Sequence, residues 1–200
     1  SDRQFIFHIT MQNHGGYEME GMENVEMISL EESNGDYPDV EVYLTGIRES
    51  DKAIDELMQY LRNVDEPVIL CIFGDHLPNV SAWIEDTAGK REDAFTLEEK
   101  QKMYAVPYMI WANYDTPYES CEMDASVNYL GAMLLQYAGI PGTDYTDFLL
   151  EMRNEVPVYN AFGYRTSDGN WHSFDEETEV SDWIRDYRIV QYYEMFDDKK

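Results

Sequence analysis

The residues best suited to chemistry in this sequence follow an apolar run. Val68 to Phe73 are six β-forming residues, and the run stops at Gly74, Asp75 and His76. Such a run is typical of a strand buried on both faces, as in a parallel sheet covered by helices. Open α/β sheets bind their ligands beyond the carboxyl ends of the strands. Asp75 and His76 are therefore placed where such a fold would carry out its chemistry.

An aspartate and a histidine side by side can bind one divalent cation. The carboxylate supplies an anionic oxygen and the neutral imidazole supplies a nitrogen. A metal that activates water or a hydroxyl needs three or more protein ligands and an open position. We therefore predict Asp75 and His76 as two ligands of a site whose other ligands come from elsewhere; the alternative is a loop that only caps the strand.

The other three histidines differ in their surroundings. His14 is followed by Gly15 and Gly16, which expose backbone N–H groups and let an anionic ligand approach, so we take it as a candidate functional residue. A capped polar loop is the alternative. His8 lies inside an apolar stretch and is interpreted as a core histidine, and His172 lies in an aromatic stretch typical of surface or packing positions.

The elements that would position these residues are predicted from hydrophobic periodicity and turn signals. Strands are expected at 4–10, 68–73 and 104–113, helices at 42–63, 96–103, 126–141, 143–156 and 179–196, and a hairpin around Asp168–Gly169. Thr96 and Ser126 are the expected helix caps. This order predicts an α/β fold, with a parallel or mixed sheet under helical cover.

Composition excludes several classes of function. The 14 Lys and Arg against 41 Asp and Glu give a formal charge of −27, so no basic surface is available to bind nucleic acid. The 44% hydrophobic and 14% aromatic content supports a globular fold. Cys71 and Cys121 form neither a disulfide framework nor a CxxC metal motif. Without an apolar run of about 18 residues or a signal-peptide pattern, this chain is expected to be soluble.

Five stretches, in this order, resemble the carboxyl-terminal half of a sulfatase-type domain of the alkaline phosphatase superfamily, in its lipoteichoic acid synthase-like branch. They are ITMQNHGGY (9–17), LTGIRESDKAIDELMQYL (44–61), VILCIFGDHLP (68–78), VPYMIWANYD (106–115) and NYLGAMLLQYAGIP (128–141). The resemblance implies a partial sulfatase-like sheet with helices on both faces. It makes residues 1–157 the carboxyl-terminal portion of a catalytic domain, with 158–200 as a hairpin and helix packed on the same domain.

The resemblance also implies roles for three residues. Asp75 and His76 would bind the catalytic divalent cation, which is manganese or magnesium in this branch and calcium in classical sulfatases. His14 would contact the phosphate or sulfate oxygens of the substrate. The family's nucleophile, a threonine or a formylglycine, and an acidic metal ligand precede these motifs and have no matching position in residues 1–200. We therefore expect a piece of a longer enzyme that is inactive alone.

For that longer enzyme the resemblance implies a metal-dependent phosphotransferase or hydrolase acting on phosphate or sulfate esters. In the lipoteichoic acid synthase branch the donor is phosphatidylglycerol, and the catalytic domain stands on the extracellular face of a Gram-positive-type membrane, tethered by amino-terminal helices. Two alternatives stay open: a non-catalytic acidic binding domain and a degenerate superfamily member. Half of such a sheet would expose an apolar edge, so we also expect the chain to self-associate.

Overall fold

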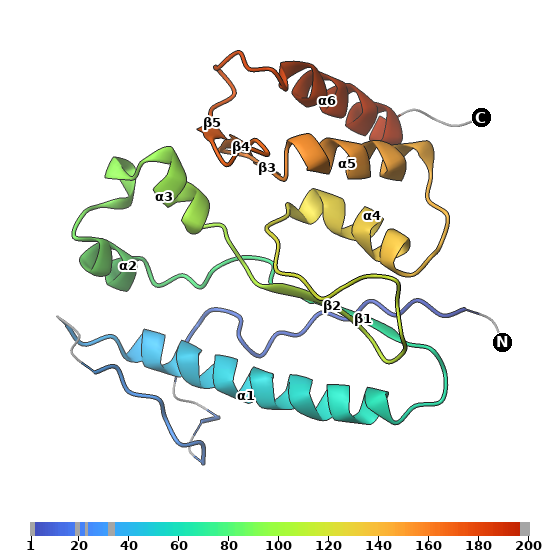
Figure 1. Ribbon diagram of the computed structural model, residues 1–200. Helices are drawn as coiled ribbons and strands as arrows, with labels where there is room; N and C mark the ends of the chain where they lie inside the picture. Colours follow the sequence, from blue (N-terminus) through green and yellow to red (C-terminus); the bar gives the residue numbers. More distant parts are fainter. Residues whose placement is uncertain (1–2, 19–20, 23, 32–34, 197–200) are drawn as a thin grey trace. The chain divides into compact units, whose positions relative to one another are not determined.

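The protein folds as helices interleaved with short antiparallel strands (Figure 1). The computed structural model describes residues 3–18, 21–22, 24–31 and 35–196. In chain order the elements are α1 (Pro38–Arg62), β1 (Ile69–Phe73), α2 (Ser81–Ala88), η1 (Glu92–Ala94), α3 (Leu97–Lys102), β2 (Tyr108–Ala112), α4 (Val127–Tyr137), α5 (Asp144–Glu155), β3 (Val158–Asn160), β4 (Gly163–Arg165), β5 (Trp171–His172) and α6 (Ser181–Phe196). They form two compact units, one of residues 1–66 and 76–94 and one of residues 67–75 and 95–200.

The first unit is organised around α1. Pro38 occupies the start of this helix, Asp39 and Glu41 lie in its first turn, and Arg62 lies in its last, all favourable to the helix dipole or to helix initiation. The helix predicted at 42–63 is thus confirmed and begins earlier than expected. Its buried residues are concentrated near its amino end, at Val40, Val42, Thr45 and Gly46.

An extended segment before α1 is held by side chains of the helix. The Ile28 N–H donates to Thr45 Oγ1 at 2.9 Å, and the Leu30 N–H donates to Glu41 Oε1 at 2.8 Å. Thr45 is fully buried, and its hydroxyl donates to the Glu41 carbonyl oxygen at 2.7 Å. The N–H groups of Ile28 and Leu30 therefore find their hydrogen-bond acceptors on side chains of α1 and not on a neighbouring strand.

In the second unit, β1 pairs with β2 in an antiparallel register that sets Cys71 opposite Ile110. The expectation that residues 68–73 are buried on both faces is wrong, because residues 68–72 are half-buried and Phe73 is exposed. Within the described residues, β1 has β2 as its one strand neighbour, so neither strand is enclosed as in a parallel sheet. Asn113 closes the far end of the pair, where its Oδ1 accepts from the Val68 N–H at 2.8 Å.

The main core of the second unit lies between helices and a small three-stranded sheet. Helix α5 packs between α4 and α6 (Figure 1). Tyr129, Met152, Tyr164 and Ile184 meet in this core. The sheet has the order β3–β4–β5, and Gly169 takes a φ of +92° in the predicted hairpin, which is confirmed. His172 stacks on Tyr164 with ring centroids 5.4 Å apart, as its packing interpretation predicts.

Two further expectations are wrong. Residues 4–10 form no strand: Phe5 is 81% exposed and Ile6 82% exposed. His8 is also exposed, so it is not a core histidine. A strand forms only beside a partner, and within the described part of the chain no strand pairs with this segment. Helix α2 was missed because its polar sequence shows no clear period, and none of its residues is buried.

None of the helices in the described ranges is both long enough and apolar enough to cross a membrane.

Candidate functional site

The loop that carries His14 is fixed on α1. A tight turn places the His14 N–H 3.1 Å from the Met11 carbonyl oxygen, with Gln12 and Asn13 at the turn's centre. Asn13 Nδ2 donates to Ser50 Oγ, on α1, at 2.8 Å. The loop therefore has one anchor within its own backbone and one on the helix.

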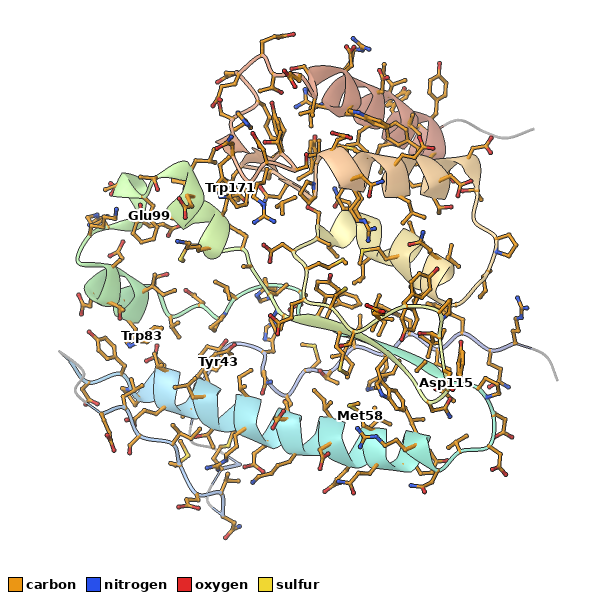
Figure 2. The ribbon with its side chains drawn as sticks, viewed as in Figure 1. Tyr43, Met58, Trp83, Glu99, Asp115 and Trp171 are labelled. Carbon is orange, nitrogen blue, oxygen red and sulfur yellow. The ribbon has the colours of Figure 1, made fainter. Side chains whose placement is uncertain are left out.

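A hollow of about 320 Å³ opens between this loop and α1. Its lining includes Asn13, His14, Gly16 and Tyr17 from the loop and Tyr43 from the helix. Figure 2 labels Tyr43, which projects from α1. The hollow combines polar groups, among them the carboxylate of Glu18, with aromatic surface, as binding sites for small polar molecules do.

His14 is one of the residues that line this hollow. Its side chain is exposed, with Nδ1 3.4 Å from the Gly15 carbonyl oxygen. Space is open around the Cα atoms of Gly15 and Gly16, and Gly16 takes a φ of +100°, which favours glycine. The approach that the sequence predicts for an anionic ligand is therefore sterically free on the glycine side.

Two tyrosines beside the loop were missed by the sequence analysis. Tyr17 and Tyr43 meet edge to face, with centroids 5.5 Å apart and ring planes at 64°. Burial raises the pKa of both phenols, and the proximity of Tyr43 raises the pKa of Tyr17 further. Both hydroxyls are therefore neutral near pH 7 and can donate hydrogen bonds. Tyr17 belongs to the same motif as His14, whereas no local signal marks Tyr43.

Asp75 and His76 directly follow β1, as predicted, and both side chains are exposed. Residue 74, before this pair, is a glycine because its backbone passes close to the residues that precede β2. Its N–H donates to the Pro107 carbonyl oxygen at 3.0 Å, and a Cβ on Gly74 would lie 3.0 Å from Val106 Cβ. The glycine thus serves a close approach of two backbones at the point where the candidate ligands begin.

The ring of His76 is oriented by the backbone of the next residue. Its Nδ1 lies 2.8 Å from the Leu77 carbonyl oxygen. With the proton on Nδ1, the imidazole presents the lone pair of Nε2, the arrangement found in metal-binding histidines. This chemistry fits a divalent cation.

The ligand set is incomplete in the described structure. Asp75 belongs to the second compact unit, whereas His76 and His14 belong to the first. Across the described ranges, no group of three or more His, Cys, Asp or Glu residues is arranged to hold a metal ion. Asp75 and His76 therefore fit as two ligands of a larger set and not as a whole site.

Three comparisons bear on these residues. The family model described as Sulfatase matches residues 1–140. A protein of Rhizobium meliloti (strain 1021), named for modification of cyclic beta-1,2-glucan, is 26% identical over 215 residues, which cover 98% of this chain and 31% of that protein. The structure of Streptococcus pyogenes phosphoglycerol transferase GacH in complex with sn-glycerol-1-phosphate matches with a TM-score of 0.61 and 20% identity.

The GacH match covers 92% of this chain and 42% of the GacH chain, and it confirms the expected α/β fold. The chain therefore spans less than half of GacH and about a third of the curated relative. The match of the family model includes His14, Asp75 and His76. The resemblance drawn from the five sequence motifs is confirmed: the chain belongs to the sulfatase family.

Proposed function

We propose that this chain is the carboxyl-terminal portion of the sulfatase-type domain of a longer, metal-dependent enzyme that transfers or hydrolyses phosphate esters, with glycerophosphate as the transferred group. The observation that carries the proposal is the hollow beside the exposed His14 and its two glycines, in a chain of the sulfatase family. The fold likeness to a phosphoglycerol transferase in complex with sn-glycerol-1-phosphate supports the choice of phosphate over sulfate.

Each residue then has a role that its chemistry allows. Asp75 and His76 hold the cation, manganese or magnesium, together with ligands outside residues 1–200. When bound, the cation supplies positive charge beside the non-bridging oxygens of the phosphate. His14 donates a hydrogen bond to those oxygens, and the N–H groups of Gly15 and Gly16 do the same. Tyr17 and Tyr43 contact the glycerol portion.

The transfer we propose takes two displacements. A hydroxyl of the enzyme, outside this chain, forms a new P–O bond while the bond from phosphorus to the diacylglycerol oxygen of phosphatidylglycerol breaks, and diacylglycerol leaves with the hydroxyl proton. The hydroxyl of an acceptor then attacks the phosphoenzyme ester, gives up its proton and restores the enzyme hydroxyl. Under this proposal, the 200-residue chain assayed alone should show no turnover.

A carbohydrate hydroxyl is the acceptor that we propose. The curated relative is named for modification of a cyclic beta-1,2-glucan, and that similarity extends over 98% of this chain. The donor would come from the membrane surface, so we place the reaction at the extracellular face, with the longer enzyme tethered there.

The test is turnover by the longer enzyme, assayed with manganese, phosphatidylglycerol and a glucan acceptor. We expect Asp75→Asn and His76→Gln each to lower turnover by about 100-fold or more. Each change removes a ligand of the cation, whose positive charge stabilises the transition state. Asp115→Asn is the matched control, since Asp115 is also exposed and follows the other strand of the pair (Figure 2). Unchanged turnover in the first two variants, or an equal loss in the control, would overturn the metal role.

A further inference from the structure

We propose that Asn13 is the positioning residue of His14. Gly46 and Ser50 of α1 form the docking position of the Asn13 side chain, and this contact holds the loop against the helix. The role of His14 toward phosphate rests on the proposed function, whereas the docking of Asn13 on α1 rests on contacts within the first compact unit. These three residues lie outside the ligand pair Asp75 and His76.

The first contact is the hydrogen bond from Asn13 Nδ2 to Ser50 Oγ, at 2.8 Å across 37 residues of sequence. Asn13 sits at the centre of the turn that ends at His14, and His14 is itself tied back to Met11 at 3.1 Å. Because the turn is closed, fixing the Asn13 side chain on the helix also fixes the backbone position of His14.

The second contact explains a glycine in the interior of a 25-residue helix. A glycine there disfavours the helix relative to alanine, so it calls for a steric reason. Gly46 is buried, and a Cβ at this position would lie 2.6 Å from Asn13 Oδ1. Gly46 and Ser50 are four residues apart and share one helix face. The missing side chain at Gly46 is therefore the space that Asn13 occupies.

The third observation is that this placement leaves a polar atom unsatisfied. Asn13 Oδ1 is buried and has no hydrogen-bond partner among the described residues. Such atoms are rare in folded proteins, because a buried carbonyl loses its hydrogen bonds to water. The loss at Asn13 Oδ1 is offset, in this proposal, by the placement of the neighbouring His14.

The experiment compares Gly46→Ala and Asn13→Ala with Gly131→Ala in the 200-residue chain. Gly131→Ala is the matched control, because a Cβ there, also within a helix, meets nothing within 4 Å. The two readouts are the order parameter of the His14 backbone N–H from ¹⁵N relaxation and the dissociation constant of sn-glycerol-1-phosphate. Tm is recorded for each protein, so that unfolding is distinguished from a loosened loop.

We expect the His14 order parameter to fall from about 0.85 to below about 0.6 in Gly46→Ala and Asn13→Ala. Affinity for glycerol phosphate should fall roughly ten-fold or more, since small misplacements of a binding group are costly. Tm of Gly46→Ala and Asn13→Ala should stay near that of the unmodified chain, because the new methyl at Gly46 meets only the end of the Asn13 side chain, which can move away. Gly131→Ala should change neither the order parameter nor the affinity. An unchanged order parameter in both Gly46→Ala and Asn13→Ala would overturn the inference.

His14→Ala separates this inference from the proposed function. If His14→Ala leaves glycerol phosphate binding as it was, the phosphate role of His14 is wrong, whatever the order parameters show. If His14→Ala weakens binding while Gly46→Ala and Asn13→Ala do not, the phosphate role stands and the positioning role of Asn13 is wrong.

Discussion

At the scale of single residues, two glycines allow close approaches next to the candidate site residues. Gly74 precedes Asp75 and lets the backbone pass Val106, whereas Gly46 leaves space for Asn13, the neighbour of His14. Neither takes the left-handed φ that usually explains a glycine. Their role is to leave out a side chain where another segment must come close.

Gly74→Ala should therefore destabilise the protein, by about 1 kcal/mol or more, because the new methyl meets Val106 Cβ at 3.0 Å. Gly131→Ala in α4 should have the opposite sign and stabilise by about 0.5–1 kcal/mol, through helix propensity alone. Urea unfolding of both variants measures the two changes in the free energy of unfolding. Equal signs for the two variants would show that the contact at Gly74 does not constrain the backbone.

The positions of Asp75, His76 and His14 were predictable because they depend on local signals: an apolar strand that ends, and a histidine before two glycines. The rest of the hollow was not. Asn13 reaches Ser50 across 37 residues, and only the folded chain brings them together. The role of Gly46 could not be predicted either, because it depends on which side chain packs against the helix at that position.

At the scale of elements, the side chain of Ser126 makes a contact other than the helix capping predicted for it. It stands at the N-cap position of α4 but makes no capping hydrogen bond from its side chain. Its hydroxyl instead donates to the Tyr159 carbonyl oxygen at 2.7 Å and accepts from the Tyr159 N–H at 2.5 Å. This one side chain thereby fastens the start of α4 to strand β3.

Ser126→Ala should cost about 2–3 kcal/mol, because it leaves a part-buried N–H and C=O of Tyr159 without their partner. Thr96→Ala is the comparison: Thr96 forms the predicted capping box with Glu99, labelled in Figure 2, on the surface. It should cost about 1 kcal/mol. Urea denaturation gives both values, and a smaller loss for Ser126→Ala than for Thr96→Ala would contradict the bridging role.

Helices α1, α4, α5 and α6 and the hairpin were predictable because their periods, caps and turn residues are local. Strand 4–10 was not correctly predicted, since an apolar sequence becomes a strand only when a partner lies beside it. Helix α2 shows the opposite case: it forms with no buried residue and a left-handed Gly89 at its end, which the polar sequence did not reveal.

At the scale of the whole molecule, the exposed apolar segment near the amino end predicts self-association. Phe5, Ile6 and Phe7 are 81%, 82% and 64% exposed, and no strand in the described ranges pairs with them. Sedimentation of the chain should show dimers or larger species, and Phe5→Ser with Phe7→Ser should weaken them about ten-fold. Tyr192→Ser, on the exposed face of α6, is the control. A strictly monomeric chain at high concentration would contradict this expectation.

The buried tyrosines predict a loss of stability in alkali. Burial raises the pKa of Tyr187 to about 12 and raises the pKa of Tyr129 as well. The folded state binds these protons more tightly than the unfolded state, so the stabilisation is complete below about pH 10. It is lost as the pH rises toward 12. Urea midpoints measured from pH 8 to 12 should fall, and Tyr187→Phe should flatten the decline; an unchanged slope in that variant would contradict it.

The proposed function depends above all on Asp75 and His76 being ligands of a catalytic divalent cation. Calorimetric titration of manganese into the chain tests it most directly, with the Asp75→Ala, His76→Ala double variant as control. We expect heat of binding in the unmodified chain and its loss in the double variant. Equal heats in the two proteins would contradict the claim.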